Sequence, residues 1–592
     1  MTRPRPHPLL DLLLLTALCL GSYLPGLTTY GLGNWQEAQR ALVAREMQDR
    51  REWIVPTAGA QPYLAKPPMI YWCQMALAGA RGARSGELDL RLTVALAGWL
   101  GVLATYGAAR RMLGSAGFGA IAGLHGPSAA RWSALFLATG VLYVHSSRVG
   151  ELDILLAPFT VVAVWGVFEA WRSAAERGRT AIGWLALAAL AGVGAALTKG
   201  PPAILTIGIA AYGGIMAWCA SAPQVLPQGE PRPARRAGAA FGAAAFLILA
   251  VYLGEPRDPR AWLGVLLLAL GGGLLGAALA GLANPRRARA CARLLSKTHP
   301  LAVLGLPLAA YFGWLWAAAA RIEPGAAVAT FETERSDNLR LFVPESPLNN
   351  LEGAAFGAGL GSLAAAAAIV WIIRRRIVPG PALWVLLAWT VGGLIAFSTL
   401  GKGVPRYLTA LWPGMAMLGA VWFASLIPRL PRGPWMRRGA LAAILAIALA
   451  QAWWYGWQRQ RAHPDRSPRD LIAELLASGI EPERLGMFEF DSPAVDFYAG
   501  RPVPSYVDIV PRPGLVGVGP RSIGDLRLSL GERGEAVLLV RRTQPGGQEP
   551  TPARDRITAA GLALEEVPTR ASLRIDNAKT EVGVFRVRAK PF

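Results

Sequence analysis

The sequence predicts a polytopic α-helical membrane protein with about 13 transmembrane helices and a small C-terminal α/β domain outside the cytoplasm. Of the 592 residues, 53% are hydrophobic and only 17% are charged, and the mean hydropathy is +0.34. The apolar residues gather into runs of about 20, the length that crosses a ~30 Å hydrocarbon core as a helix. The basic residues are distributed unevenly between the loops that join these runs.

Each apolar run is long enough to be a membrane span. The thirteen runs cover residues 8–27, 90–112, 128–146, 151–172, 180–198, 201–219, 237–254, 261–283, 301–320, 352–373, 381–399, 406–426 and 438–457. A helix of a large soluble enzyme would keep a polar face at a 3.6-residue period, whereas segment 261–283 is apolar all round. The first run follows basic residues, as in a signal peptide, but no small-x-small cleavage site follows it. We therefore interpret it as a retained helix.

The Lys and Arg residues predict the orientation. With a cytoplasmic N-terminus, the inner segments hold 23 Lys and Arg residues and the short outer loops hold 6. This satisfies the positive-inside rule and predicts an inner-membrane protein whose C-terminal domain lies outside the cytoplasm. The net charge of +22 follows largely from this asymmetry, so a nucleic-acid partner is not needed to explain it.

We expect two domains. Residues 1–458 would form the transmembrane domain, with outer loops at 28–89 and 321–351, and residues 459–592 would form the outer domain. In that tail, 467–480 has a helical period, and "RLGMFEF", "AVLLVRR" and "EVGVFRVR" are typical of strands. Of the four cysteines only Cys73 lies in a predicted outer segment, which excludes a disulfide framework there.

Isolated ionisable residues collect at the predicted outer ends of the helices. Charged groups at such depths are costly and often mark a substrate path, although a single lysine or arginine can simply extend its side chain to the interface. These residues are Arg148, Glu151 and Asp153, then Lys199, then Lys402 and Arg406 with the adjacent Tyr407. Their collection on one face favours a functional site.

The first outer loop adds two candidates. In "QPYLAKPPMIYW", Lys66 precedes two prolines, which stiffen the backbone and hold the lysine in an extended segment. Upstream, a short amphipathic helix is expected from about Trp35 to Arg50, with apolar Trp35, Ala38, Ala41 and Leu42 on the membrane and Arg40, Arg45 and Asp49 in water. Glu37 would lie in its first turn, either stabilising the helix dipole or acting as a base.

Six segments in order resemble the GT-C glycosyltransferases, in particular the protein O-mannosyltransferases and the transferases that attach aminoarabinose to lipid A. They are "GLGNWQEAQRALVAREMQDRREWIVP", "YLAKPPMIYW", "LRLTVALAGWLG", "SRVGELDILLAPF", "ALTKGP" and "KGVPRYLTALWP". The resemblance spans residues 10 to about 430, and the tail is similar to the outer domain of the lipid A branch. It implies a GT-C fold, a polyprenyl-phosphate sugar donor, and transfer at the outer face without a nucleotide sugar.

The chemistry of such a donor suggests roles for the candidates. The leaving phosphate gains negative charge in the transition state, which fixed cations stabilise. Lys66, Arg406 and Tyr407, supplemented by Lys402 or Lys199, would contact this phosphate. Glu37 would be the carboxylate nearest the acceptor, and Asp153, held ionised by Arg148, would have an orienting role.

The chain departs from the family pattern at two places. The usual Asp-Glu pair of the first loop is Gln36 and Glu37 here, so either Glu37 acts as the base or the acceptor is already ionised. In loop 321–351, Asp337 and Arg340 stand where the family has a His and an Arg. No cofactor is required and zinc is unsupported; a divalent cation on Glu37, Asp153 and Asp337 is a weaker alternative.

Two rival functions and the acceptor stay open. A transporter or flippase for a lipid-linked precursor would predict broken helices and ionisable groups near mid-membrane. A non-catalytic scaffold that displays the outer domain would not need Glu37 or Asp153. For the enzyme, a lipid A-like glycolipid, another envelope glycan and a protein hydroxyl all fit as acceptors.

Overall fold

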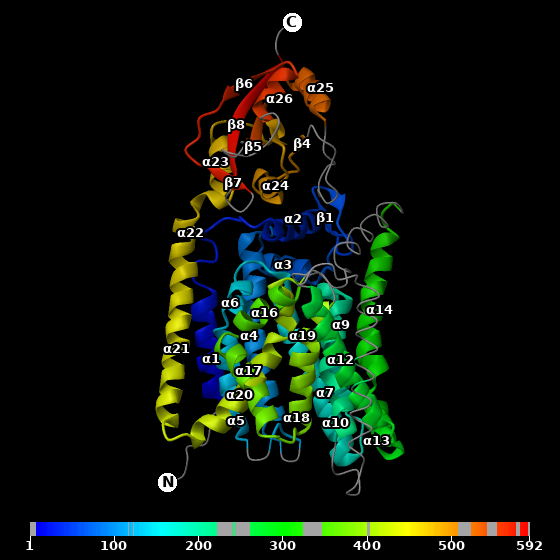
Figure 1. The fold of residues 1–592 in the computed structure, drawn as a ribbon. Helices are drawn as coiled ribbons and strands as arrows, with labels where there is room; N and C mark the ends of the chain where they lie inside the picture. The colour runs from blue at the N-terminus through cyan, green and yellow to red at the C-terminus, as the bar shows by residue number, and fades with distance from the viewer. Residues whose placement is uncertain are drawn as a thin grey trace. The chain divides into compact units, whose positions relative to one another are not determined.

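The chain divides into two compact units, which are described one at a time. The first comprises Met1–Leu24, Val94–Trp316 and Glu334–Ala452, and the second comprises Pro25–Thr93, Ala317–Thr333 and Trp453–Phe592. The computed structural model describes residues 8–115, 118–121, 124–221, 240, 243, 261–323, 346–399, 403–506, 522–541, 553–575 and 580–589 (Figure 1). The predicted loop 28–89 thus groups with the C-terminal residues.

The first unit is helical. Its elements are α1 Pro8–Tyr23, α4 Glu87–Met112 (whose first turns belong to the second unit), α5 Gly126–Ala138, α6 Val141–Ser146, η1 Leu152–Leu155, α7 Leu156–Arg177, α8 Ile182–Lys199, α9 Pro201–Ile207, η2 Gly208–Gly213, α10 Gly214–Ser221, α12 Ala261–Leu282, α13 Pro285–Thr298, α14 Pro300–Ala319, α16 Ser346–Gly357, α17 Leu360–Arg374, α18 Pro381–Leu387, η4 Ala388–Gly392, α19 Gly393–Thr399, η5 Pro405–Ala410, α20 Trp412–Leu426, η6 Ile427–Arg429 and α21 Gly433–Trp453.

The predicted helical membrane protein is confirmed, whereas the number of spans stays a prediction. Within the described residues, seven helices are long and apolar enough to cross a membrane, or eight if the pair α16 and α17, bent by 108°, counts as one span. Run 128–146 is divided between α5 and α6, and run 406–426 begins with the short helix η5. Run 237–254 lies outside the described residues, apart from residues 240 and 243.

Small residues let the helices of the first unit approach closely. Helix α20 packs along α17 and α5, and α7 packs along α8 (Figure 1). A Cβ at Gly419 of α20 would collide with the carbonyl oxygen of Gly361 in α17. Such glycine contacts are typical of helices that associate inside a membrane, where van der Waals packing replaces the hydrophobic effect.

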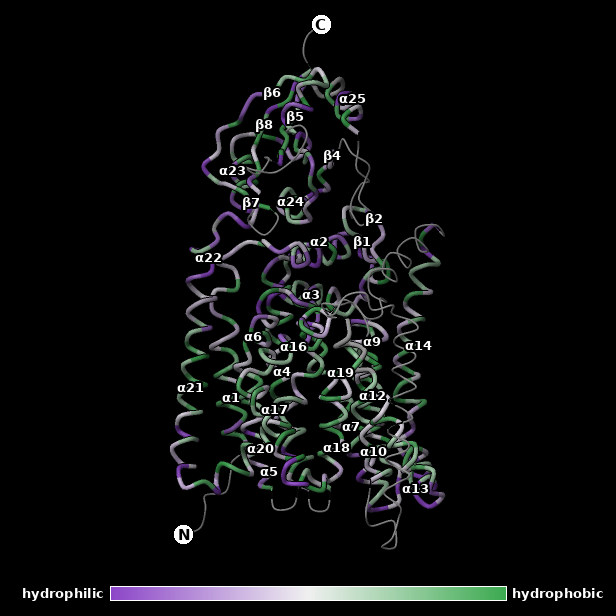
Figure 2. The backbone as a smooth tube through the Cα atoms, in the orientation of Figure 1, coloured by the Kyte–Doolittle hydropathy of each residue, from purple (hydrophilic) through white to green (hydrophobic). Residues whose placement is uncertain are grey.

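Two helices at the periphery of the first unit present apolar side chains that the described residues leave exposed. Only 22% of the α14 span and 11% of the span that starts with α21 is buried inside the protein. Leu301 and Trp316 of α14 and Leu445 and Leu449 of α21 are exposed. Figure 2 shows hydrophobic residues along both helices. Exposed apolar surface of this extent fits lipid rather than water.

The second unit combines outer-loop elements with an α/β fold. Its elements are α2 Trp35–Asp49, β1 Thr57–Ala58, β2 Gln61–Pro62, α3 Met69–Ala80, η7 Trp454–Gln458, α22 Arg459–Ala462, η8 Pro464–Arg466, α23 Arg469–Ala477, η9 Pro482–Arg484, β3 Leu485–Phe488, α24 Pro493–Ala499, β4 Ser505–Tyr506, α25 Ile523–Arg533, β5 Glu535–Arg541, α26 Ala553–Ala559, β6 Leu562–Glu566, β7 Leu573–Ile575 and β8 Thr580–Ala589.

The predicted α/β tail is confirmed, including its helix and three strands. The sheet has the order β4-β3-β5-β8-β6, with β7 also paired to β8. Strand β3 runs parallel to β4 and β5, and β8 runs antiparallel to β5. Alternate residues of β5 enter two cores: Val537 and Leu539 pack with α23 and α24, whereas Leu538 and Val540 pack with α25 and α26. Helices therefore cover both faces of the sheet.

The helix predicted at Trp35–Arg50 is confirmed as α2. Ala38, Ala41 and Leu42 of its apolar face are buried, but the faces assigned to Trp35 and Arg40 are wrong. Asn34 caps the helix by accepting a hydrogen bond from the amide of Gln36 at 2.9 Å. Trp35 is 42% exposed, and Arg40, expected in water, is 6% exposed. The reason is that α2 packs against α3 and α24 of its own unit, so protein contacts decide its buried face.

Candidate functional site

Four ionisable residues from three distant segments of the first unit form one cluster. Glu151 precedes η1 and Asp153 lies within it, Lys199 is the last residue of α8, and Arg406 belongs to η5. The short helices η1 and η5 contact each other, and η1 also contacts α8. The structure thus brings together residues that are up to 255 positions apart in the chain.

The backbone around the cluster is held in place locally. After Lys199 the chain turns through Gly200, whose φ of +73° is a conformation that favours glycine, and α9 begins at the next residue. Helix η5 is anchored by Trp389, whose indole donates a hydrogen bond to the carbonyl oxygen of Ala410 at 2.8 Å. The side chains of the cluster therefore extend from fixed turns.

The two carboxylates are buried and the two cations are partly exposed. The side chains of Glu151 and Asp153 are 5% and 3% exposed, whereas those of Lys199 and Arg406 are 16% and 27% exposed. Nε of Arg406 lies 3.4 Å from Glu151 Oε2 and 3.7 Å from Asp153 Oδ2. Lys199 Nζ forms an ion pair and hydrogen bond with Asp153 Oδ1. The buried acids thus hold both cations.

An aromatic ring completes the cluster. Lys199 Nζ lies 3.6 Å from the centre of the Tyr407 ring, and Arg406 Cζ lies 5.8 Å from it. Cations at these distances are attracted to the negative face of the ring. The two acids balance the two bases in formal charge. Because the carboxylates and the ring fix the positions of Lys199 and Arg406, an incoming anion would meet cations that are already in place.

Arg148, predicted to hold Asp153 ionised, is fully buried and donates a hydrogen bond from Nη1 to the carbonyl oxygen of Ser22 at 2.7 Å. The structure gives Asp153 ion pairs with Lys199 and Arg406, both of which were expected to contact the donor phosphate. The supporting roles of Arg148 and Glu151 stay predictions.

In the second unit, Glu37 belongs to a buried ion pair. Its side chain is 1% exposed, and Oε1 accepts a hydrogen bond from Nε of Arg91 at 2.8 Å. Arg91 is fully buried and also donates to the carbonyl oxygens of Leu27 and Tyr30, each at 2.6 Å. Glu87 Oε2 lies 3.5 Å from the same guanidinium. This pair fixes the backbone that precedes α2.

One atom of Glu37 has no such partner. Its Oε2 is buried and accepts no hydrogen bond from any residue that the structure describes. Buried polar atoms in native structures normally have a partner, so Oε2 is the atom of Glu37 that could accept a further hydrogen bond.

Sequence reasoning missed Arg91. It lies four residues after Glu87, and the apolar run 90–112 begins at Leu90, so an arginine stands inside that run. The high cost of burying an unpaired charge could have indicated a carboxylate partner. Nothing in the sequence identified Glu37, which is 54 positions away, as that partner.

Lys66 lies in a bend between β2 and α3, and Pro68, two residues further on, occupies the N-cap position of α3. Its side chain is partly buried, and Nζ donates to the carbonyl oxygen of Ala65 at 3.0 Å. Lys402, Asp337 and Arg340 lie outside the described residues. No group of three or more metal-binding side chains occurs within the described part of the chain.

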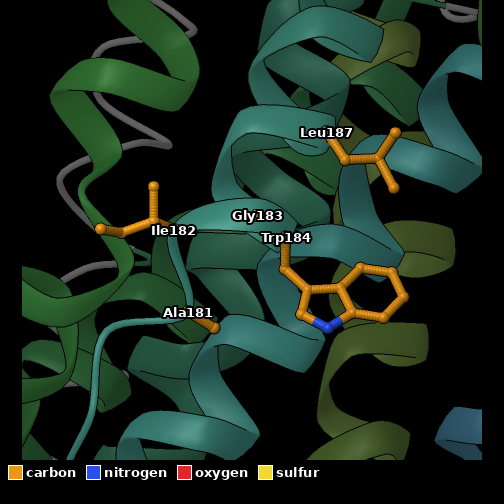
Figure 3. Close-up of a pocket in the computed structure, with 5 residues that line it drawn as sticks. All are labelled: Ala181, Ile182, Gly183, Trp184 and Leu187. Carbon is orange, nitrogen blue, oxygen red and sulfur yellow. The ribbon is translucent and has the colours of Figure 1, made fainter.

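A shallow surface depression of about 390 Å³ lies elsewhere, at the start of α8. Ala181, Ile182, Gly183, Trp184 and Leu187 line it, as Figure 3 shows. None of these side chains is ionisable, and none is a predicted site residue. The depression thus offers apolar contacts but no group that could do acid–base chemistry.

The chain was compared with known proteins. Residues 65–220 match the family of dolichyl-phosphate-mannose-protein mannosyltransferases. The structure is similar to that of ArnT from Cupriavidus metallidurans bound to undecaprenyl phosphate, with a TM-score of 0.62, 16% identity, and coverage of 98% of this chain and 97% of that one. The apo form of the same protein gives a TM-score of 0.62 and 17% identity over the same shares. No curated protein matches this chain in sequence.

A third solved structure is less similar. It is the archaeal oligosaccharyltransferase AglB from Archaeoglobus fulgidus in complex with an inhibitory peptide and a dolichol-phosphate, with a TM-score of 0.48, 14% identity, and coverage of 90% of this chain and 69% of that one.

The family match covers part of the chain, and the structural similarity shows the fold. The fold is the one shared with ArnT, and the matched segment contains Lys66, Arg148, Glu151, Asp153 and Lys199. The resemblance predicted from the sequence is confirmed in two respects: residues 65–220 match this mannosyltransferase family, and the chain is a multi-pass membrane protein with the fold of ArnT.

Proposed function

We propose that this protein transfers a sugar from a polyprenyl-phosphate donor to a cell-envelope acceptor at the outer face of the inner membrane. The observation that carries the proposal is the cluster of Glu151, Asp153, Lys199, Arg406 and Tyr407. It presents two partly exposed cations at the ends of candidate membrane helices, held by buried acids. The ArnT structure with undecaprenyl phosphate supports a lipid phosphate as the ligand.

In the proposed reaction, the phosphate of the donor binds at Lys199 and Arg406. The acceptor oxygen forms a bond to the anomeric carbon while the bond between that carbon and the phosphate oxygen breaks, and the phosphate oxygen keeps the electron pair of the broken bond. The lipid phosphate thereby gains charge, which cations fixed in advance stabilise more strongly in the transition state than in the ground state. The fork of an arginine suits phosphate oxygens. Lys66 and Lys402 are proposed as further phosphate contacts.

The carboxylates would divide two tasks. Asp153 and Glu151 hold the cations in place and do not need to accept a proton. Glu37 would accept the proton of an acceptor hydroxyl through Oε2, since Oε1 is held by Arg91. An acceptor phosphate, already ionised, would not need this step. A lipid A-like glycolipid, another envelope glycan and a protein hydroxyl all remain as acceptors.

A transporter or flippase for a lipid-linked precursor is the second candidate. The bent pair α16 and α17 is a broken helix of the kind such a protein would have. The clustered ionisable groups, however, lie at helix ends, next to η1, η5 and the start of α9, rather than within uninterrupted helices. Chemistry on a bound phosphate explains that placement better than passage through the membrane.

The test first measures binding of the lipid phosphate and then identifies the acceptor. Undecaprenyl phosphate binding to the purified full chain is measured for the wild type, for Arg406→Ala and for the control Arg432→Ala, an exposed arginine elsewhere in the first unit. We expect Arg406→Ala to bind at least tenfold more weakly and the control to bind normally. Mass spectrometry of envelope glycans and lipids from cells without the protein then identifies the acceptor. Normal binding by Arg406→Ala would remove the proposed phosphate site.

A further inference from the structure

Helix α13 of the first unit, Pro285–Thr298, is strongly basic. It carries five Arg and Lys residues and no acid. It joins the apolar helix α12 to the candidate span α14, separated from each by only one or two residues. A helix placed between two such ends lies at the membrane surface, and Figure 2 shows hydrophilic residues along it.

Four of the basic residues share one face, which we call the basic face of α13: Arg286, Arg289, Arg293 and Lys297. Their spacings of three, four and four residues place them above one another on a helix. The three arginines are exposed and Lys297 is half-buried. The opposite face packs against α7 and α10 and contains Cys291 and Thr298, which are 5% and 0% exposed.

The helix is fixed at both ends. Asn284 caps the N-terminus by accepting hydrogen bonds from the amides of Arg286 and Arg287 at 3.0 and 3.4 Å. Near the C-terminus, the carbonyl oxygen of Thr298 accepts a hydrogen bond from the Tyr212 hydroxyl at 2.9 Å. Basic residues that only set membrane topology need no folded element, whereas these cations are presented on a fixed surface.

The cations of the basic face repel one another. Neighbours in the series are three or four residues apart, the spacing at which like charges destabilise a helix. Arg286 also lies in the first turn, where the helix dipole disfavours a positive charge. Within the described part of the chain, no ion pair joins any of the four to a carboxylate. An anion bound along this face would relieve the repulsion.

We propose that the basic face of α13 binds the headgroups of anionic phospholipids in the leaflet where α12 and α14 end. The phosphates of that leaflet lie at the level of a surface helix, and Lys/Arg clusters next to a membrane helix attract them. Arginine pairs with phosphate oxygens through two parallel N–H groups. This surface lies outside the cluster at Asp153 and does not depend on the proposed transfer reaction.

The test uses the purified full chain in detergent and native mass spectrometry, with phosphatidylglycerol and phosphatidylcholine as probes. We expect the wild type to retain phosphatidylglycerol preferentially. In Arg286→Gln/Arg289→Gln/Arg293→Gln/Lys297→Gln, binding should weaken by about fivefold per removed cation. The matched control removes four exposed arginines from other helix ends: Arg374→Gln/Arg375→Gln/Arg432→Gln/Arg438→Gln. The control should keep the preference.

A second measurement on the wild type does not depend on the folding of any variant. Raising the salt concentration screens charges and should release phosphatidylglycerol but not phosphatidylcholine. Equal retention of the two lipids by the wild type, salt-independent binding, or normal phosphatidylglycerol binding by the α13 variant would each overturn the proposal. So would equal losses in the α13 variant and in the control, because the site would then not be specific to α13.

Discussion

The buried pair of Glu37 and Arg91 allows structural and catalytic roles to be separated. Glu37→Gln removes the charge that faces a guanidinium with no solvent access. Breaking a buried ion pair by changing one partner costs about 3–5 kcal/mol. Glu87, 3.5 Å from the same guanidinium, and the carbonyl oxygens of Leu27 and Tyr30 stay in place, so we expect the lower end of that range.

The loss of stability is measured by thermal unfolding of the purified protein in detergent. A loss of about 3 kcal/mol in a unit of this size lowers Tm by roughly 6–12 °C. Arg91→Met should destabilise by a similar or larger amount, since it leaves Glu37 and three backbone carbonyls without their donor. The double variant Glu37→Gln/Arg91→Met should then be more stable than the sum of the two single losses predicts.

Transfer is assayed well below the lowest Tm of the set. A general base contributes typically 10²–10⁴ in rate, so Glu37→Gln should be slowed by about that factor while it still binds the donor. The double variant should stay slow even where stability recovers, because the proton acceptor is absent. An unchanged Tm in Glu37→Gln would refute the stabilising role of the pair. Near-normal turnover in the folded variant would refute the base and favour an acceptor that is already ionised.

Four further results are expected. Arg406→Ala should slow transfer by about 10²–10³, because a contact to the charge of the transition state is lost, and it should lower Tm by no more than a few degrees. A kcat equal to that of the wild type would exclude Arg406 as a phosphate contact. Asp153→Asn should impair both donor binding and turnover because Lys199 and Arg406 lose a shared carboxylate, and an effect on kcat alone would contradict that role. A reporter that is active only outside the cytoplasm should work when fused after residue 460 and be silent near residue 290; the reverse pattern would move every candidate to the wrong face. Burial, with the nearby charges of Asp491 and Glu46, raises the pKa of Asp496 to about 8 from an ordinary value near 3.8. Between these two pH values the folded protein keeps the carboxyl proton of Asp496 and the unfolded chain loses it. The free energy of unfolding should therefore fall as pH rises from about 4 to 8. Asp496→Asn should flatten this fall in Tm, and an unchanged pH profile would show that Asp496 does not cause it.

The general architecture could be predicted because its signals are local. Runs of about 20 apolar residues indicate membrane helices without knowledge of any partner. Likewise, the alternation in β5 between Val537 and Leu538 reflects a sheet with helices on both faces. The faces of α2 could not be predicted this way, since Arg40 is buried by elements that follow much later in the chain.

The candidate site was predictable only in part. Isolated charges at helix ends identified Asp153, Lys199 and Arg406 one by one, and the structure adds that they contact each other. Periodicity carries no information on such long-range pairing, and the resemblance supplied only their order along the chain. Arg91 inside an apolar run could have indicated a carboxylate partner, but no signal identified Glu37 as that partner, because an ion pair between remote segments depends on the tertiary fold.

The second unit joins the beginning of the chain to its end, which has a consequence for folding. The hydroxyl of Tyr498 accepts a hydrogen bond from the amide of Leu32 at 2.7 Å, and these two residues are 466 positions apart in the sequence. Arg45 likewise donates to the carbonyl oxygen of Phe497 at 2.7 Å. During synthesis, the segment that contains Glu37 emerges first and must wait for nearly the whole chain before these partners exist. Contacts of such high sequence separation form late. In a chain that stops before residue 498, the segment around Glu37 would therefore lack the hydrogen bond that Leu32 makes to Tyr498. The loop 28–89 can therefore complete its contacts only after the C-terminal domain has been synthesised.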